Sequence, residues 1–134
     1  MKKDYQYLVD LAFEAMANAY APYSNYYVGA CIQLKDGKTI KGANIENASY
    51  GATSCAERNA IFATYSLGYR LEDIEAIAIV SSGKILAGPC GICRQVLSEL
   101  LPQEAPIILS NRKETLTTNI KNLLPMQFGK RDLV

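Results

Sequence analysis

Segments with helical apolar spacing alternate along the chain with short strand-like segments, and this order constrains the fold more than any other feature. Residues 5–16 repeat apolar side chains at helical spacing, whereas residues 26–34 are rich in the aromatic and β-branched side chains typical of strands. Further helices are predicted over about 54–67 and after Pro89, a last helical turn over 120–124, and further strands over 38–40, 74–80, 106–109 and 115–118. This alternation predicts a three-layer α/β fold around one mixed sheet of about five strands.

Glycine and proline mark where these elements should end. Asp36-Gly37 is typical of the two-residue turn of a hairpin, and Gly68 follows the second helix as a C-terminal stop. We expect Pro22 to end the first helix and Pro102 to end the third. The chain shows no internal repeat, low-complexity segment or linker, so residues 1–134 are predicted to form a single domain.

Charge and hydropathy exclude several classes of partner. The formal net charge is +1, and acidic and basic residues are mixed along the chain, without the basic face of a nucleic-acid binder. No apolar run approaches the roughly 20 residues that cross a bilayer, and the first residues lack the apolar core of a signal peptide. We therefore expect a cytoplasmic protein with a small-molecule substrate and with reduced cysteines.

The chain has no histidine, so a metal site must use Cys, Asp or Glu, and histidine-based catalytic triads are excluded. Cys90 and Cys93 lie three apart at one predicted helix start, and Cys55 lies at another. Helix N-termini stabilise thiolates. Three thiolates favour Zn²⁺, and three protein ligands leave a fourth position open to water, as in catalytic zinc sites.

Charged residues beside these cysteines complete the predicted site. Glu57 lies two residues beyond Cys55, so it can reach a metal-bound water without binding the metal. A carboxylate in an apolar pocket has a raised proton affinity, which suits Glu57 to accept and return a proton. Arg58 is placed to donate hydrogen bonds to the ligand sulfurs, and Arg94 and Gln95 are further candidates for that role.

The cysteine motifs also carry a resemblance to a known family. Cys55-Ala-Glu-Arg58 and Pro89-Cys-Gly-Ile-Cys-Arg94 match the signature of zinc deaminases in its three-cysteine form. Together with residues 20–24, 28–30, 44–51, 95–96 and 123–128, they resemble the small, homotetrameric cytidine deaminases over nearly the whole chain. The resemblance implies hydrolytic deamination of cytidine and 2′-deoxycytidine in pyrimidine salvage. In that reaction zinc-bound hydroxide attacks C4, while Glu57 moves protons to N3 and to the departing amine.

The same resemblance implies which residues bind the substrate. Asn44 and Glu46 would hydrogen-bond the ribose hydroxyls, as suits an amide and a carboxylate at a strand end. Tyr26 and Phe128 would pack against the pyrimidine face, and the backbone of Ala56 would read the edge of the base.

A shared active site is a further implication of the family pattern. Phe128 would reach in from a neighbouring subunit, and Tyr50 and Gly51 would border a neighbour's site, so a homotetramer is implied. The sequence departs from the family at two places near the pocket. Tyr26 stands where the family commonly has Phe, and Met126-Gln127 replaces small residues.

Three other functions compete with this interpretation. A blasticidin-type antibiotic deaminase shares the three-cysteine core, although the Asn44-x-Glu46 stretch favours an ordinary ribose. A structural zinc module would recruit Cys31 as a fourth ligand and leave no open position, whereas Cys31 in an apolar strand favours a core residue. An enzyme that edits tRNA or DNA would need a basic surface that this sequence lacks.

Overall fold

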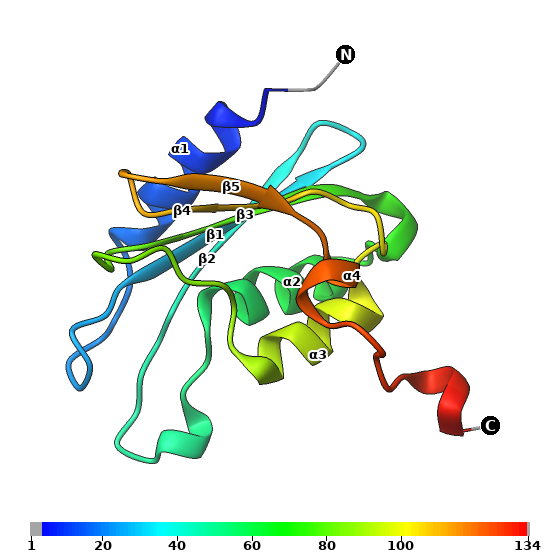
Figure 1. The fold of residues 1–134 in the computed structure, drawn as a ribbon. Helices are drawn as coiled ribbons and strands as arrows, with labels where there is room; N and C mark the ends of the chain where they lie inside the picture. The colour runs from blue at the N-terminus through cyan, green and yellow to red at the C-terminus, as the bar shows by residue number, and fades with distance from the viewer. Residues whose placement is uncertain (1–3, 134) are drawn as a thin grey trace.

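The computed structural model describes residues 4–133 as one mixed sheet with helices on both faces (Figure 1). In chain order the elements are α1 (Gln6–Met16), β1 (Val28–Leu34), β2 (Thr39–Ala43), α2 (Ala56–Ser66), β3 (Ile74–Ser81), α3 (Gly91–Leu100), β4 (Ile107–Ser110), β5 (Thr115–Thr118) and α4 (Ile120–Leu123), with 3-10 turns at Tyr50–Ala52, Leu71–Asp73 and Lys130–Leu133. The strand order is β2-β1-β3-β4-β5; β3 and β4 are parallel, and the other neighbours are antiparallel. The predicted α/β class with a mixed five-stranded sheet is confirmed.

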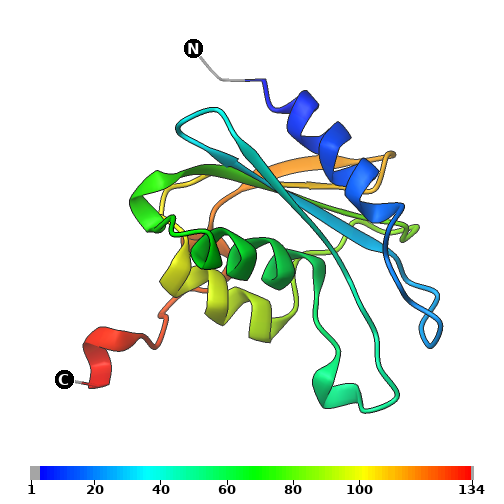
Figure 2. The same ribbon diagram turned by 180° about the vertical axis from the view of Figure 1, so that it is seen from behind.

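Two cores lie on the two faces of the sheet. Figures 1 and 2 show α1 on one face and α2 and α3 on the other. Successive side chains of a strand point to opposite faces, so Ala76, Ala78 and Val80 of β3 pack with the residues of α1. Ile77 and Ile79 pack with α2 and α3 in the larger cluster. The three layers therefore follow from the continuous apolar pattern of β3, which is buried on both sides.

The end of α1 differs from the sequence expectation. The helix ends at Met16, so the prediction that Pro22 ends it is wrong. Pairing with a distant segment takes the chain out of the helix before the proline is reached. The Tyr20 amide donates to the Asn44 carbonyl at 2.9 Å, and the Tyr20 carbonyl accepts from the Glu46 amide at 2.8 Å. This pairing brings the loop after α1 beside the end of β2.

Other predicted boundaries agree with the structure to within about two residues, except that β2 was predicted to end at residue 40 and extends to Ala43, because its pairing with β1 continues to Gly29. The hairpin between β1 and β2 turns at Gly37, whose φ of 96° is the left-handed conformation that favours glycine. Gly68, with φ of 98°, follows the end of α2 as predicted. Within residues 4–133, no helix has both the length and the apolar character required to cross a membrane.

Two glycines allow helices to approach the sheet closely. A Cβ atom on Gly29 of β1 would lie 2.0 Å from the Ala12 carbonyl oxygen of α1. A Cβ atom on Gly42 of β2 would lie 2.5 Å from the Ala56 carbonyl oxygen of α2. Both obstacles are backbone atoms, which cannot rotate away as a side chain would. These glycines therefore set the distance of each helix from the sheet.

The substitution Gly29→Ala is expected to destabilise the protein, because the added methyl group forces α1 away from β1. Overpacking of this kind lowers the free energy of unfolding by about 1–3 kcal/mol. Urea denaturation would measure the change. Gly129→Ala is the matched control, since a Cβ atom there meets nothing within 4 Å. An unfolding midpoint for Gly29→Ala equal to that of the control would contradict the close approach.

Candidate metal and catalytic site

Three cysteine thiols meet where α2 and α3 begin. Cys55 and Cys90 are the residues that precede the two helices, and neither uses its side chain to cap its helix. Cys93 lies in the first turn of α3, and the three Sγ atoms are all within 4.8 Å of one another. Cys55 Sγ and Cys90 Sγ are 3.9 Å apart. A tetrahedral zinc ion with Zn–S bonds of about 2.3 Å places its sulfurs about 3.8 Å apart, so the three thiols fit zinc.

The electrostatics of this cluster favour a thiolate at Cys55. The Cys93 thiol hydrogen-bonds to it and the Arg58 guanidinium lies beside it, and together they lower the pKa of Cys55 to about 5. The pKa of Cys93 is raised, because its proton is shared with the Cys55 sulfur and because the residue is buried. The cluster therefore concentrates negative charge where a cation would bind.

Arg58 contacts the sulfur cluster from α2. Its Nη2 atom lies 3.4 Å from Cys55 Sγ and 3.4 Å from the Thr53 carbonyl oxygen, while its Nε atom is buried without a hydrogen-bond partner. Arg94 and Gln95, the other candidates for contacting sulfur, bind backbone carbonyls instead. Arg94 donates to the carbonyls of Pro89 and Leu123, and Gln95 donates to the carbonyl of Phe128.

The substitution Arg58→Ala is expected to weaken zinc binding about 10- to 100-fold, because it removes the guanidinium that orients and stabilises the Cys55 thiolate. Competition with a zinc chelator would measure the affinity. Arg70→Ala is a suitable control, since Arg70 stacks on Tyr65 and binds the carbonyls of Tyr65 and Tyr69. Unchanged zinc affinity and an unchanged pH profile of activity would make Arg58 a structural residue only.

Glu57 is a buried carboxyl beside the thiols. It lies in the first turn of α2, and its side chain is 4% exposed. Burial raises the pKa of Glu57 to about 7. A carboxyl group that titrates near neutrality can both accept and return a proton at physiological pH. Glu57 therefore has the burial and the proton affinity of a catalytic acid/base.

A cavity of about 380 Å³ joins this cluster to the polar residues near the end of β2. Cys55, Glu57 and Cys90 lie along its wall together with Tyr26, Asn44 and Glu46, and the remaining lining residues are Ser24, Val28, Thr53, Ser54, Ile79, Val80, Ser81, Ala87, Gly88 and Pro89. A volume of this size is within the range of small-molecule pockets. The fold thus brings six of the sequence-predicted site residues to one cavity, although they come from four separate stretches of the chain. Cys93 and Ala56 do not line it and are fully buried.

The polar side chains of Asn44 and Glu46 in the cavity wall hold the loop that precedes β1. Asn44 Oδ1 accepts from the Val28 amide at 2.9 Å, and Asn44 Nδ2 donates to the Tyr26 carbonyl at 2.8 Å. Glu46 Oε1 accepts from the amides of Tyr23 and Ser24 at 3.0 and 3.1 Å. Glu46 Oε2 accepts from the Ser24 hydroxyl. This role of Ser24 was not predicted from the sequence. Its only signal there is that Ser24 belongs to residues 20–24, one of the stretches that resemble the deaminase family.

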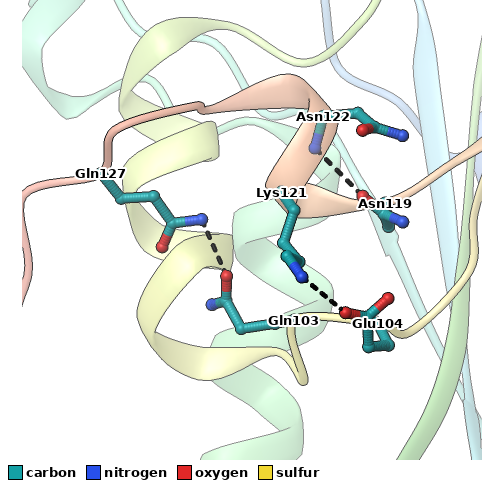
Figure 3. Close-up of polar contacts among 6 residues, drawn as sticks. All are labelled: Gln103, Glu104, Asn119, Lys121, Asn122 and Gln127. Carbon is teal, nitrogen blue, oxygen red and sulfur yellow. Dashed lines mark hydrogen bonds and ion pairs between the residues drawn. The ribbon is translucent and has the colours of Figure 1, made fainter.

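Phe128 and Tyr50 do not line this cavity. Phe128 is 58% exposed and Tyr50 is 75% exposed; Tyr50 borders an adjacent hollow of about 280 Å³. Figure 3 shows how the segment that leads to Phe128 is anchored: Gln127 donates to Gln103 at 2.8 Å, Lys121 pairs with Glu104 at 2.9 Å, and Asn119 accepts from the Asn122 amide. A contribution of Phe128, Tyr50 or Gly51 to a neighbour's site stays a prediction.

The structural-zinc alternative does not agree with the position of the fourth cysteine. Cys31 is fully buried in the core between the sheet and α1, whereas the three clustered thiols lie on the side of α2 and α3. Among residues 4–133, the cluster that could hold a metal ion consists of Cys55, Cys90 and Cys93. Burial raises the pKa of Cys31 to about 11, as expected of a core thiol. The cluster therefore keeps room for a non-protein ligand.

Comparison with known proteins agrees with this geometry. Residues 2–108 match the family model described as the cytidine and deoxycytidylate deaminase zinc-binding region. A cytidine deaminase from Halalkalibacterium halodurans is 47% identical over 97% of this chain and 98% of its own length. One from Mycobacterium tuberculosis is 40% identical over 97% and 93%. The crystal structure of cytidine deaminase from Burkholderia pseudomallei superposes with a TM-score of 0.89 at 41% identity, and the match covers 94% of this chain and all of that one.

The fold and the three-thiol site with its buried carboxyl together define a zinc-dependent deaminase. The chain belongs to the family of cytidine and deoxycytidylate deaminases.

Proposed function

We propose that this protein hydrolyses cytidine and 2′-deoxycytidine to uridine and 2′-deoxyuridine, with release of ammonia, in pyrimidine salvage. The observation that carries the proposal is the single cavity that joins Cys55, Cys90 and Glu57 to Asn44 and Glu46. This cavity would bring a metal ion and a proton carrier together with the groups that we assign to the sugar. The names of the relatives that are 40–47% identical support the same reaction, and they do not favour an antibiotic deaminase.

The charges around the cavity favour an unphosphorylated nucleoside. Among the described residues that line it, Glu46 and Glu57 carry carboxyl groups and none is lysine or arginine. Hydrogen bonds from Ser24 keep the pKa of Glu46 low, so this carboxylate is ionised at neutral pH. A 5′-phosphate group would meet no cationic side chain among the described residues that line the cavity, and it would be repelled by Glu46.

The chemistry divides between a metal ion and one carboxyl group. Cys55, Cys90 and Cys93 would hold zinc, which when bound lowers the pKa of a coordinated water towards neutrality. The Glu57 carboxylate accepts a proton from the attacking water as its oxygen bonds to C4, and gives that proton to N3. Glu57 then takes the remaining proton from the new C4 hydroxyl and transfers it to the amino group, so that the C4–N bond breaks and ammonia leaves as the C4 carbonyl forms.

Binding of the nucleoside is assigned to other groups that line or adjoin the cavity. Asn44 and Glu46 would hydrogen-bond the ribose hydroxyls, and Tyr26 would pack against the pyrimidine ring. Ala56 lies in the first turn of α2, where backbone amides lack helical partners, and its backbone would read the edge of the base.

We further propose a homotetramer in the cytoplasm whose active sites are shared between subunits, with no nucleic-acid or membrane partner. Exposed apolar side chains near the cavity and in the C-terminal segment support assembly: Tyr50 is 75% exposed, Met126 101% and Phe128 58%. Covering Phe128 in a neighbour's pocket would remove an exposed aromatic from water. Multi-angle light scattering tests the tetramer, and a monomer that retains full activity would contradict the shared sites.

One assay panel tests the reaction itself. Cytidine, 2′-deoxycytidine, CMP, cytosine and blasticidin S would be compared for ammonia release, with and without a zinc chelator. The expected result is chelator-sensitive turnover of the first two compounds. Turnover of blasticidin S or CMP alone would replace the proposed substrate, and turnover that survives complete zinc removal would contradict the proposed chemistry.

A further inference from the structure

Three donors from one loop hold the Glu46 carboxylate. The amides of Tyr23 and Ser24 donate to Oε1, and the Ser24 hydroxyl donates to Oε2. A carboxylate has about four lone-pair sites. These three hydrogen bonds from Tyr23 and Ser24, here called the Glu46 clamp, leave the carboxylate with capacity for about one further hydrogen bond. Recognition of a single sugar hydroxyl requires one.

The Ser24 hydroxyl connects this carboxylate to a second residue of the cavity. While it donates to Glu46, its oxygen accepts from the Tyr26 amide at 3.1 Å. Tyr26 and Glu46 both line the cavity, and Tyr26 is assigned to the base whereas Glu46 is assigned to the sugar. One side chain thus fixes the relative placement of both groups.

The hydroxyl restricts a motion that the amides alone leave free. The two amide bonds both bind Oε1 and leave Oε2 without a partner, so they constrain the terminal torsion of the glutamate, which has a broad energy minimum, at only one of its two oxygens. The bond from Ser24 to Oε2 fixes that torsion. The same bond contributes most to the lowered pKa of Glu46, which keeps the group an acceptor.

We propose that Ser24 is a positioning residue of the nucleoside site, whose hydroxyl fixes the Glu46 carboxylate for the sugar. The inference rests on the proposed function, because it takes Glu46 to bind the nucleoside. Ser24 then acts on substrate binding and leaves the deamination step at Glu57 unaffected.

The substitution Ser24→Ala is therefore expected to raise KM for cytidine about 2- to 10-fold, the effect of one net hydrogen bond, with kcat and zinc content unchanged. Ser24→Thr keeps the hydroxyl and should restore KM to near the wild-type value. Ser66→Ala is the matched control, because Ser66 is exposed at the end of α2 and does not line the cavity. A fall in kcat at unchanged KM, or failure of threonine to restore KM, would overturn the proposal.

A double-mutant cycle with Glu46→Ala separates action through Glu46 from a direct effect. If Ser24 works through the carboxylate, Ser24→Ala should raise KM much less once Glu46 is alanine than it does in the wild-type background, and only the contact of Ser24 with the Tyr26 amide remains to be lost there. An equal rise in both backgrounds would show that Ser24 acts independently, contrary to the proposal.

A measurement without substrate distinguishes failure of this inference from failure of the proposed function. If the wild-type protein released no ammonia from cytidine, the proposed function would be wrong, yet the clamp would remain testable by NMR titration of ¹³C-labelled glutamate. Ser24→Ala should raise the pKa of Glu46, and an unchanged pKa would overturn the clamp. The other titratable side chains that line the two adjoining cavities are the same in both proteins: Tyr23, Tyr26, Tyr50, Cys55, Glu57 and Cys90.

Discussion

Replacing Glu57 with glutamine is expected to lower kcat by several powers of ten while each chain keeps close to one zinc ion. Glutamine has nearly the same shape as glutamate but can neither accept nor return a proton at neutral pH. General acid/base groups contribute about 10²- to 10⁴-fold to rate, and Glu57 is assigned more than one transfer in the cycle. Its burial favours this role, since the same burial raises the pKa of the carboxyl to about 7.

The measurement needs zinc content and kcat from the same preparation. Glu72→Gln, a change of the same chemistry at an exposed position, is the control and should leave both quantities unchanged. A Glu57→Gln protein that turns over cytidine at a near-normal rate would show that protons move through another group. A protein that has lost its zinc would instead place Glu57 among the groups that retain the metal.

Removing one thiol from the cluster is expected to abolish zinc binding and, with it, activity. Cys90→Ala leaves two sulfurs where three lie within 4.8 Å of one another, and two thiolates do not complete a tetrahedral site. Cys90 is the best position for the test because it is exposed, whereas Cys93 is buried in the core. The fold should therefore survive the substitution, and the loss can be attributed to the metal.

Cys31→Ala is the matched control for this loss. Cys31 is also a free thiol, but it lies in the core beneath α1 on the other face of the sheet. Elemental analysis of the purified variants should find close to one zinc per chain for Cys31→Ala and almost none for Cys90→Ala. The opposite pattern would mean that the metal site has been assigned to the wrong cysteines.

The sequence predicted most of the elements because their apolar patterns are regular. It predicted that Cys55, Cys90 and Cys93 lie together because their positions at two helix starts are a local property. The predicted end of α1 was wrong because Tyr20 pairs with the backbone of Asn44 and Glu46, a contact between segments more than 20 residues apart. No local pattern reports such a contact.

The hydrogen bonds around the site could not be predicted from the sequence for the same reason. Ser24 binds Glu46 from 22 residues away, and Arg94 binds the Leu123 carbonyl from 29 residues away. Their partners depend on how the loops are placed once the sheet has formed. The role assigned to Phe128 depends on contacts with a second subunit. Neither a local sequence pattern nor the structure of a single chain can show such contacts.

The positions of Cys55 and Cys90 at two helix starts have a consequence for the reactivity of the metal. The complex of a dication with three thiolates has a net charge of −1, which would make the metal ion a weaker Lewis acid. Each helix N-terminus carries about half a positive charge, and α2 and α3 both begin at the sulfurs. The backbone itself therefore offsets the excess, so a chain without histidine can keep its zinc electrophilic without recruiting a neutral ligand.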